Sequence, residues 1–105
     1  MNLELKNSLE SAIRWLTEVA TVKDNKAFCP HSRKMPVEFW NGALKGDYHA
    51  GQRQWRCLCP AWHTGQAVKA LIMAAGILEK PELIEKAKFN AEFIMRNRIR
   101  EGEDR

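Results

Sequence analysis

The sequence predicts an all-α protein in which three helices are joined by one long ordered loop, between the first helix and the second. Apolar residues recur at helical spacing near the start of the chain. A later stretch, 62–79, is apolar on nearly every face of a helix. A Lys80-Pro81 pair then leads into another amphipathic stretch, because proline is well tolerated in the first turn of a helix.

The first helix is expected from residue 3 to about residue 22. Its apolar positions follow the spacing of one helix face: Leu5, Leu9, Ala12, Ile13, Leu16, Val19 and Ala20. Charged residues such as Glu4 and Lys6 fall mostly on the opposite side. Trp15 lies beside the apolar stripe, where it is expected to contact a neighbouring element.

Residues 23 to 60 show neither a helical nor a strand period, and prolines and glycines interrupt them repeatedly. This connection of about 38 residues far exceeds the usual link of about 2–8 residues between packed helices. Its aromatic content argues against disorder, so we expect an ordered loop packed on the domain. Short helical turns or strand pairs fit best at Val37–Leu44 and Gln52–Leu58.

The second and third helices, 62–79 and about 81–99, each need more than one neighbour. A helix that is apolar all round must be surrounded by protein, and small residues such as Ala74 and Gly76 allow close approach in the second. The third carries Phe89 and Phe93 roughly opposite its main apolar stripe. Either self-association or further helices would cover the spare apolar faces.

Charge and cysteines narrow the class of protein. All of the formal +4 charge falls between Lys23 and Pro60, which carries seven basic against three acidic residues. Such a segment is either a solvated loop with basic side chains or a surface that attracts anions such as sugar acids or phosphates. Nucleic acid is disfavoured because its binding surfaces concentrate more positive charge. The odd number of cysteines and the start of the chain, without a basic leader and apolar run, favour a cytoplasmic protein with reduced thiols. The longest mainly apolar stretch is too short to cross a bilayer.

The stretch from Trp55 to Leu71, WRCLCPAWHTGQAVKAL, resembles the opening helical hairpin of the six-hairpin (α/α) toroid carbohydrate enzymes. Glycoside hydrolases, uronyl hydrolases and sugar epimerases share that architecture. The resemblance covers about residues 55 to 100 and implies a sugar-binding cleft at the start of an inner helix. It also implies that residues 1–105 are the N-terminal fragment of a larger toroid, with the remainder of the toroid, or a second copy of the chain, as partner and carbohydrate as ligand.

A sugar-facing wall is the first candidate site. Aromatic rings stack on the apolar faces of sugars, while amides and imidazoles bond to hydroxyl groups. The candidate residues lie in the loop and at the start of the second helix: Trp40, Asn41, Tyr48, His49, Trp55, Trp62, His63 and Gln66. The alternative is that these aromatic side chains fill the core of a small domain.

Hydrolysis of a glycoside usually needs two carboxylates. Asp47, presented after Gly46, is the candidate catalytic acid, and Glu38 is the other carboxylate of the loop. In the resembling families an acid can precede the Thr-Gly-Gln motif, whereas His63 stands there in this chain. The expected function is therefore part of the sugar-binding cleft of a glycoside hydrolase-like protein, with a uronic acid favoured by the basic loop and without a cofactor.

The alternative is a small non-enzymatic helical module that binds a protein partner through its spare apolar faces, held together by zinc. Cysteine and histidine are the usual ligands of structural zinc, and a long irregular loop gains most from such a site. The candidate ligands are Cys29, His31, Cys57, Cys59 and His63. Both pairs have one intervening residue, whereas the usual zinc knuckle has two.

Overall fold

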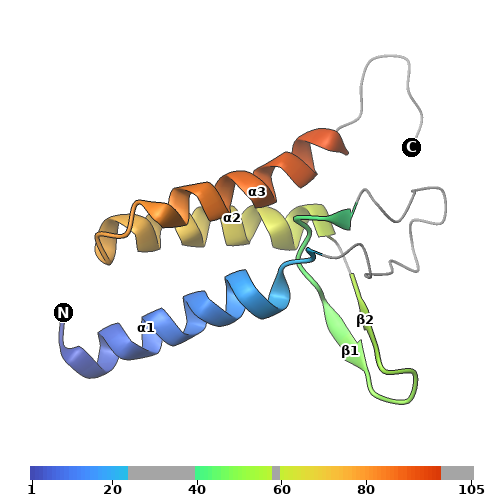
Figure 1. Ribbon diagram of the computed structural model, residues 1–105, viewed down its shortest axis with the longest axis horizontal. Coiled ribbons are helices and arrows are strands. Elements are labelled where there is room, and N and C mark those ends of the chain that lie inside the picture. Colours follow the sequence, from blue (N-terminus) through green and yellow to red (C-terminus); the bar gives the residue numbers. More distant parts are fainter. Residues whose placement is uncertain (24–39, 58–59, 98–105) are drawn as a thin grey trace.

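A computed structural model describes residues 1–23, 40–57 and 60–97 of the chain. Within these residues the molecule is mainly helical, with one β-hairpin beside the helices (Figure 1). The elements in chain order are α1 (Leu3–Trp15), the π-helix η1 (Leu16–Ala20), β1 (Asp47–His49), β2 (Gln54–Arg56), α2 (Pro60–Ile77) and α3 (Glu82–Arg96).

The prediction of an all-α fold belonging to an incomplete toroid was wrong. Strands β1 and β2 form a two-stranded antiparallel sheet, in which Tyr48 pairs with Trp55 and Asp47 with Arg56. Each strand has only three residues, too few for a strand period to be read from the sequence. The described helices form a small layered packing and no toroid.

The first helix begins as expected but changes its winding before it ends. The Asn2 side chain accepts a hydrogen bond from the backbone N–H of Leu5 at 2.8 Å and so caps α1. The last turn, η1, is a π-helix, and Thr21 then leaves in an extended conformation. The Thr21 hydroxyl donates to the Leu16 carbonyl at 2.9 Å and thereby satisfies an acceptor at the helix end.

The chain after η1 pairs with the segment that leads into the hairpin. The Val22 N–H donates to the Ala43 carbonyl, and the Lys45 N–H donates to the Ala20 carbonyl. The hydroxyl of Thr64, fully buried on α2, accepts from the Leu44 N–H at 3.0 Å. These bonds fix the hairpin to both the first helix and α2.

Helices α2 and α3 form an antiparallel pair with a tight connection at Leu78–Pro81. Together with α1 they enclose the main core, whose buried members are Ile13, Leu71, Ala74, Ala75, Leu78, Leu83 and Ala87. Helix α2 begins at Pro60, two residues before the predicted start, and α3 begins at Glu82, one residue after the predicted start at about residue 81. None of the helices in the described part of the chain is long and apolar enough to span a membrane.

A second core lies where the hairpin segment meets α3. It contains Val22, Trp40, Ala43, Cys57 and Phe93, all buried. The rings of Trp40 and Phe93 stack with their centroids 5.9 Å apart. Gly42 lies against α3 in this region, with a φ of 93°.

Candidate functional site

The hairpin carries two neighbouring aromatic residues, Tyr48 and Trp55, with the cation Lys45 beside them. We call these three residues the hairpin patch. Tyr48 and Trp55 are directly opposite on β1 and β2, with ring centroids 5.2 Å apart, and Tyr48 is 50% exposed. The Lys45 ammonium lies 5.4 Å from the centre of the Trp55 ring and donates to the Val19 carbonyl at 2.9 Å. Lys45 therefore holds the Trp55 ring against the end of the first helix through a cation–π contact.

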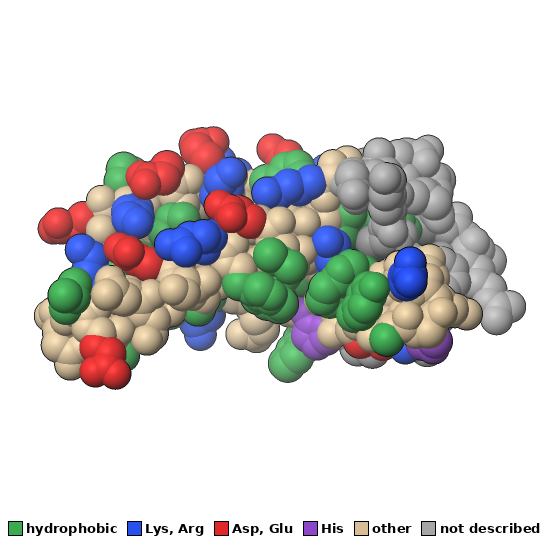
Figure 2. Space-filling model, turned by 60° about the horizontal axis from the view of Figure 1, so that its bottom comes forward, with side chains coloured by type: hydrophobic (Ala, Val, Ile, Leu, Met, Phe, Trp, Pro, Cys, Tyr) green, Lys and Arg blue, Asp and Glu red, His purple; other side chains and the backbone are tan. Residues whose placement is uncertain are grey.

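Figure 2 shows how side chains of each type are distributed over one face of the molecule. Hydrophobic side chains gather in the middle of that face, beside a histidine, whereas charged side chains of both signs crowd the part over the helices. Trp15 and Val19, near the end of the first helix, are also among the exposed large hydrophobic residues. An exposed aromatic surface with a cation at its edge is able to stack on a sugar ring or on another apolar surface.

Asp47, the predicted catalytic acid, is engaged in an ion pair. Its carboxylate forms a short ion pair with the guanidinium of Arg56, its cross-strand partner, and both side chains are half-buried. The pair satisfies Asp47 Oδ2 and stabilises the hairpin from its polar side. The second candidate carboxylate, Glu38, lies outside the described residues.

The predicted residues on α2 form a separate group. Trp62 is 67% exposed, and its ring contacts that of His63 at a centroid distance of 5.3 Å. Gln66 is exposed one turn further along the helix. This group lies on the outer surface of α2, not on the hairpin.

The remaining predicted sugar contacts have structural partners. Trp40 is 3% exposed and packs in the second core. The Asn41 carbonyl accepts a short hydrogen bond from Arg96 on α3. His49 Nδ1 accepts from the Gln52 N–H at 3.3 Å within the hairpin turn. The predicted wall is thus divided between the hairpin, the start of α2 and the interior.

The predicted zinc ligands fall mostly outside the described residues. Cys29, His31 and Cys59 are among them, while Cys57 is buried in the second core and His63 lies on α2. Within 1–23, 40–57 and 60–97, no three His, Cys, Asp or Glu side chains converge on a common point where a metal ion would fit.

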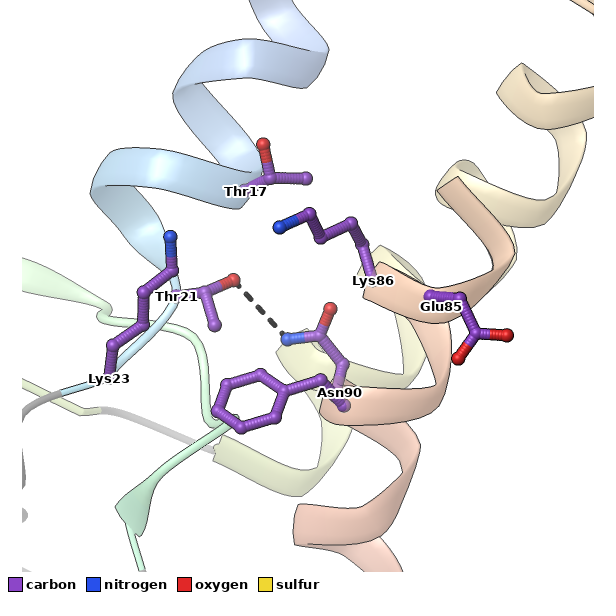
Figure 3. Close-up of a pocket in the computed structure, with 7 residues that line it drawn as sticks. Thr17, Thr21, Lys23, Glu85, Lys86 and Asn90 are labelled. Atoms are coloured by element: carbon purple, nitrogen blue, oxygen red, sulfur yellow. Dashed lines mark hydrogen bonds between the residues drawn. The ribbon is translucent and has the colours of Figure 1, made fainter. Parts of the chain in front are cut away.

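A pocket that the sequence analysis did not predict lies between the first helix and α3 (Figure 3). It has a volume of about 470 Å³. The first helix and the residues after it contribute Thr17, Thr21 and Lys23, and α3 contributes Glu85, Lys86, Phe89 and Asn90. The signal for it in the sequence was Asn90, a polar residue at a position where the α3 pattern turns a side chain to the core.

The outer side of α2 is apolar and open; we call it the α2 face. Its large apolar members are Trp62, Ile72, Met73 and Ile77, between 50% and 67% exposed. At a helical spacing of 100° per residue they share one side with Gln66, Lys69, Ala70 and Gly76. Lys69 is the single Lys, Arg, Asp or Glu of the whole helix.

Comparisons with known proteins identified no relative of this chain. No model of a known protein family matches the chain, and neither the curated proteins nor the solved structures contain a significant match. The function is therefore argued from the residues alone.

Proposed function

We propose that this protein is a small helical interaction module that associates with a second copy of itself through the α2 face. One observation carries the proposal: the longest described helix keeps four large apolar side chains at least half exposed, with one charge among them. Clustered apolar surface of this kind marks interaction sites, because each large apolar side chain gains about 1.5–3 kcal/mol on full burial.

The way side-chain size varies along α2 favours pairing of two copies. The bulky Trp62 stands near one end of the face, and Gly76, without a side chain, stands near the other. In an antiparallel pair these ends meet, so that Trp62 of each copy lies opposite Ile77 of the other, beside the space that Gly76 leaves. The antiparallel arrangement also opposes the two helix dipoles, and twofold dimers are the commonest oligomers.

The proposed twofold axis passes between Lys69 and Ala70, midway between Trp62 and Ile77. Gln66 of one copy then lies opposite Met73 of the other. Near the axis, Lys69 covers the apolar contact with its aliphatic stem and keeps its ammonium in water.

Sedimentation equilibrium on the whole chain tests the association. We expect a monomer–dimer equilibrium between roughly 1 and 100 µM. Met73→Glu should shift the protein to monomer, because it places a charge inside the apolar contact. Leu5→Glu, at a similarly exposed apolar position on α1, is the matched control and should leave the dimer intact. A wild-type monomer throughout this range contradicts the proposal.

The antiparallel register has its own test. A cysteine introduced by Ala70→Cys lies beside its own copy across the axis, so mild oxidation should yield a disulfide that joins two peptides containing residue 70. Gln66→Cys is the control, since residue 66 lies far from its own symmetry mate in this register. Equal cross-linking at both positions excludes the register.

A second candidate function, carbohydrate binding, is favoured by the hairpin patch. The exposed ring of Tyr48 beside Trp55 supplies a stacking surface, and Lys45 supplies a cation for an acidic sugar. We propose binding without a hydrolytic step, since Asp47 is neutralised by Arg56.

Calorimetry should show tighter binding of a galacturonate oligosaccharide than of a neutral glucose oligosaccharide. Tyr48→Ala should weaken that binding and Trp62→Ala should not; the reverse pattern rules out the hairpin patch.

We place the module in the cytoplasm. Cys57 is buried in the second core, and Cys59 is only one residue further, a poor spacing for a disulfide between them. The proposal therefore requires no oxidising compartment.

A further inference from the structure

We infer that the pocket between the first helix and α3 binds a small hydroxycarboxylate, with the carboxylate at Lys23 and Lys86 and a hydroxyl donating to Asn90. The pocket is distinct from both the α2 face and the hairpin patch.

Asn90 is 2% exposed, and its amide has one allowed orientation. Its Nδ2 donates to the Gly42 carbonyl at 2.6 Å and to the Thr21 hydroxyl oxygen at 3.3 Å. The Thr21 hydroxyl gives its single proton to the Leu16 carbonyl, so toward Asn90 it acts as an acceptor. A flipped amide would set Oδ1 against two acceptors. Both N–H groups are therefore used, and Oδ1 is held in place as an acceptor.

The Asn90 oxygen faces the pocket. In Figure 3 it is directed away from Thr21 and into the space toward Lys86. Among the described residues, no donor to Asn90 Oδ1 is found. A buried acceptor of fixed direction recognises a ligand donor such as a hydroxyl group at little cost in ordering, because its own position is already set.

The charges at the pocket favour a monoanion. Figure 3 shows Lys86 reaching from α3 toward Thr17, and Lys23 approaching from the segment after the first helix, while the Glu85 carboxylate points away from both. Glu85 is already paired with Lys88, at 3.0 Å. In the described part of the chain, no acidic partner is found for Lys23 or Lys86. A carboxylate between the two ammonium groups would be bound by charge-assisted hydrogen bonds.

The remaining wall and the size of the pocket limit the ligand. Phe89 supplies an apolar surface for a carbon chain or ring. About 470 Å³ is within the range of small-molecule pockets and accommodates a six-carbon compound. A ligand with a carboxylate, an aliphatic skeleton and at least one hydroxyl matches all the groups present.

Three six-carbon probes test the inference by isothermal titration calorimetry. Gluconate has a carboxylate and hydroxyls, hexanoate has only the carboxylate, and sorbitol has only hydroxyls. Gluconate should bind at least tenfold more tightly than either of the others. Equal affinities for gluconate and sorbitol would remove the carboxylate from the proposal, equal affinities for gluconate and hexanoate would remove the hydroxyl, and absence of gluconate binding would refute the site.

Matched lysine variants locate the site. Lys86→Met keeps the aliphatic stem, removes the charge and should weaken gluconate binding about tenfold. Lys6→Met removes an exposed lysine of α1 that does not line the pocket and should leave the affinity unchanged. Met73→Glu should also leave it unchanged, so the pocket and the α2 dimer are tested separately. Equal losses of affinity in Lys86→Met and Lys6→Met would show that gluconate is attracted only by the overall positive charge of the surface.

Discussion

At the scale of single residues, Gly42 has the most demanding surroundings of the glycines in the described segments. A Cβ at this position would lie 2.6 Å from the Phe89 carbonyl oxygen and 3.1 Å from the Phe93 Cβ. Its φ of 93° is also outside the regions that other residues adopt easily. The absence of a side chain lets residues 40–43 of the second core touch α3, where the Gly42 carbonyl fixes Asn90.

Gly42→Ala should therefore destabilise the protein by about 2–4 kcal/mol, since backbone strain and a backbone clash act together. Thermal unfolding followed by circular dichroism measures the loss. Gly51→Ala is the control, because a Cβ there meets only ordinary contacts with His49. Similar melting temperatures for wild type and Gly42→Ala would mean that the segment shifts without cost.

At the scale of elements, the start of α1 depends on a single cap. Asn2 accepts from the Leu5 N–H, and Glu4 in the first turn complements the positive end of the helix dipole. Asn2→Ala should cost about 1 kcal/mol, because it leaves a donor at the helix end without its side-chain acceptor.

Hydrogen exchange of the α1 amides, together with the melting temperature, checks this prediction. Asn7→Ala, an exposed substitution within the same helix, is the control and should be neutral or slightly stabilising, because alanine is the better helix former. If both variants lose the same stability, the cap contributes nothing.

The pocket also belongs to the scale of elements, because it lies between the end of the first helix and α3, which the hydrogen bond from Asn90 to Thr21 joins. The π-helix η1 directs Thr17 and Thr21 toward α3, and the two hydroxyls bond back to carbonyls of their own helix. π-helical turns occur frequently at functional sites, which agrees with a binding role for this end of the helix.

At the scale of the whole molecule, two buried clusters share α3. Ala87 belongs to the main core and Phe93 to the second, less than two turns apart on one helix. The hydroxyl of Thr64 further links α2 to Leu44 in the loop segment. This connectivity predicts that the two clusters unfold together.

Leu71→Ala in the main core should cost about 2–5 kcal/mol, and Val22→Ala in the second core about 1–2 kcal/mol. Both should lower the same transition. Tryptophan fluorescence, which includes the buried Trp40, and circular dichroism, which follows the helices, should give coincident unfolding curves for each variant. Separate curves would show that the clusters are independent units.

The helices were predictable from the sequence because their signals are local. The spacing of apolar residues placed α2 and α3 within a few residues, and Pro81 marked the start of α3. The start of the first helix was also predicted, while its conversion to a π-helix was not, because that turn depends on the contacts that Thr21 makes after the helix ends.

The candidate sites were less predictable, since residue type does not decide exposure. Trp40 and Trp62 are both tryptophans near the same loop, yet Trp40 is buried against Phe93 and Trp62 is largely exposed. Likewise, the sequence suggested Asp47 as a catalytic acid, and the strand register places Arg56 directly opposite.

The sequence by itself determined three helices, their apolar faces and the excess of apolar surface on α2, because each follows from short-range periodicity and composition. Tertiary structure decided the hairpin, the interior position of Trp40 and the pocket around Asn90. The strands of the hairpin are close in the sequence but too short to show a period. The surroundings of Trp40 and the pocket join segments separated by many residues, as in the bond from Asn90 to Gly42, and such pairings depend on packing and not on any local pattern.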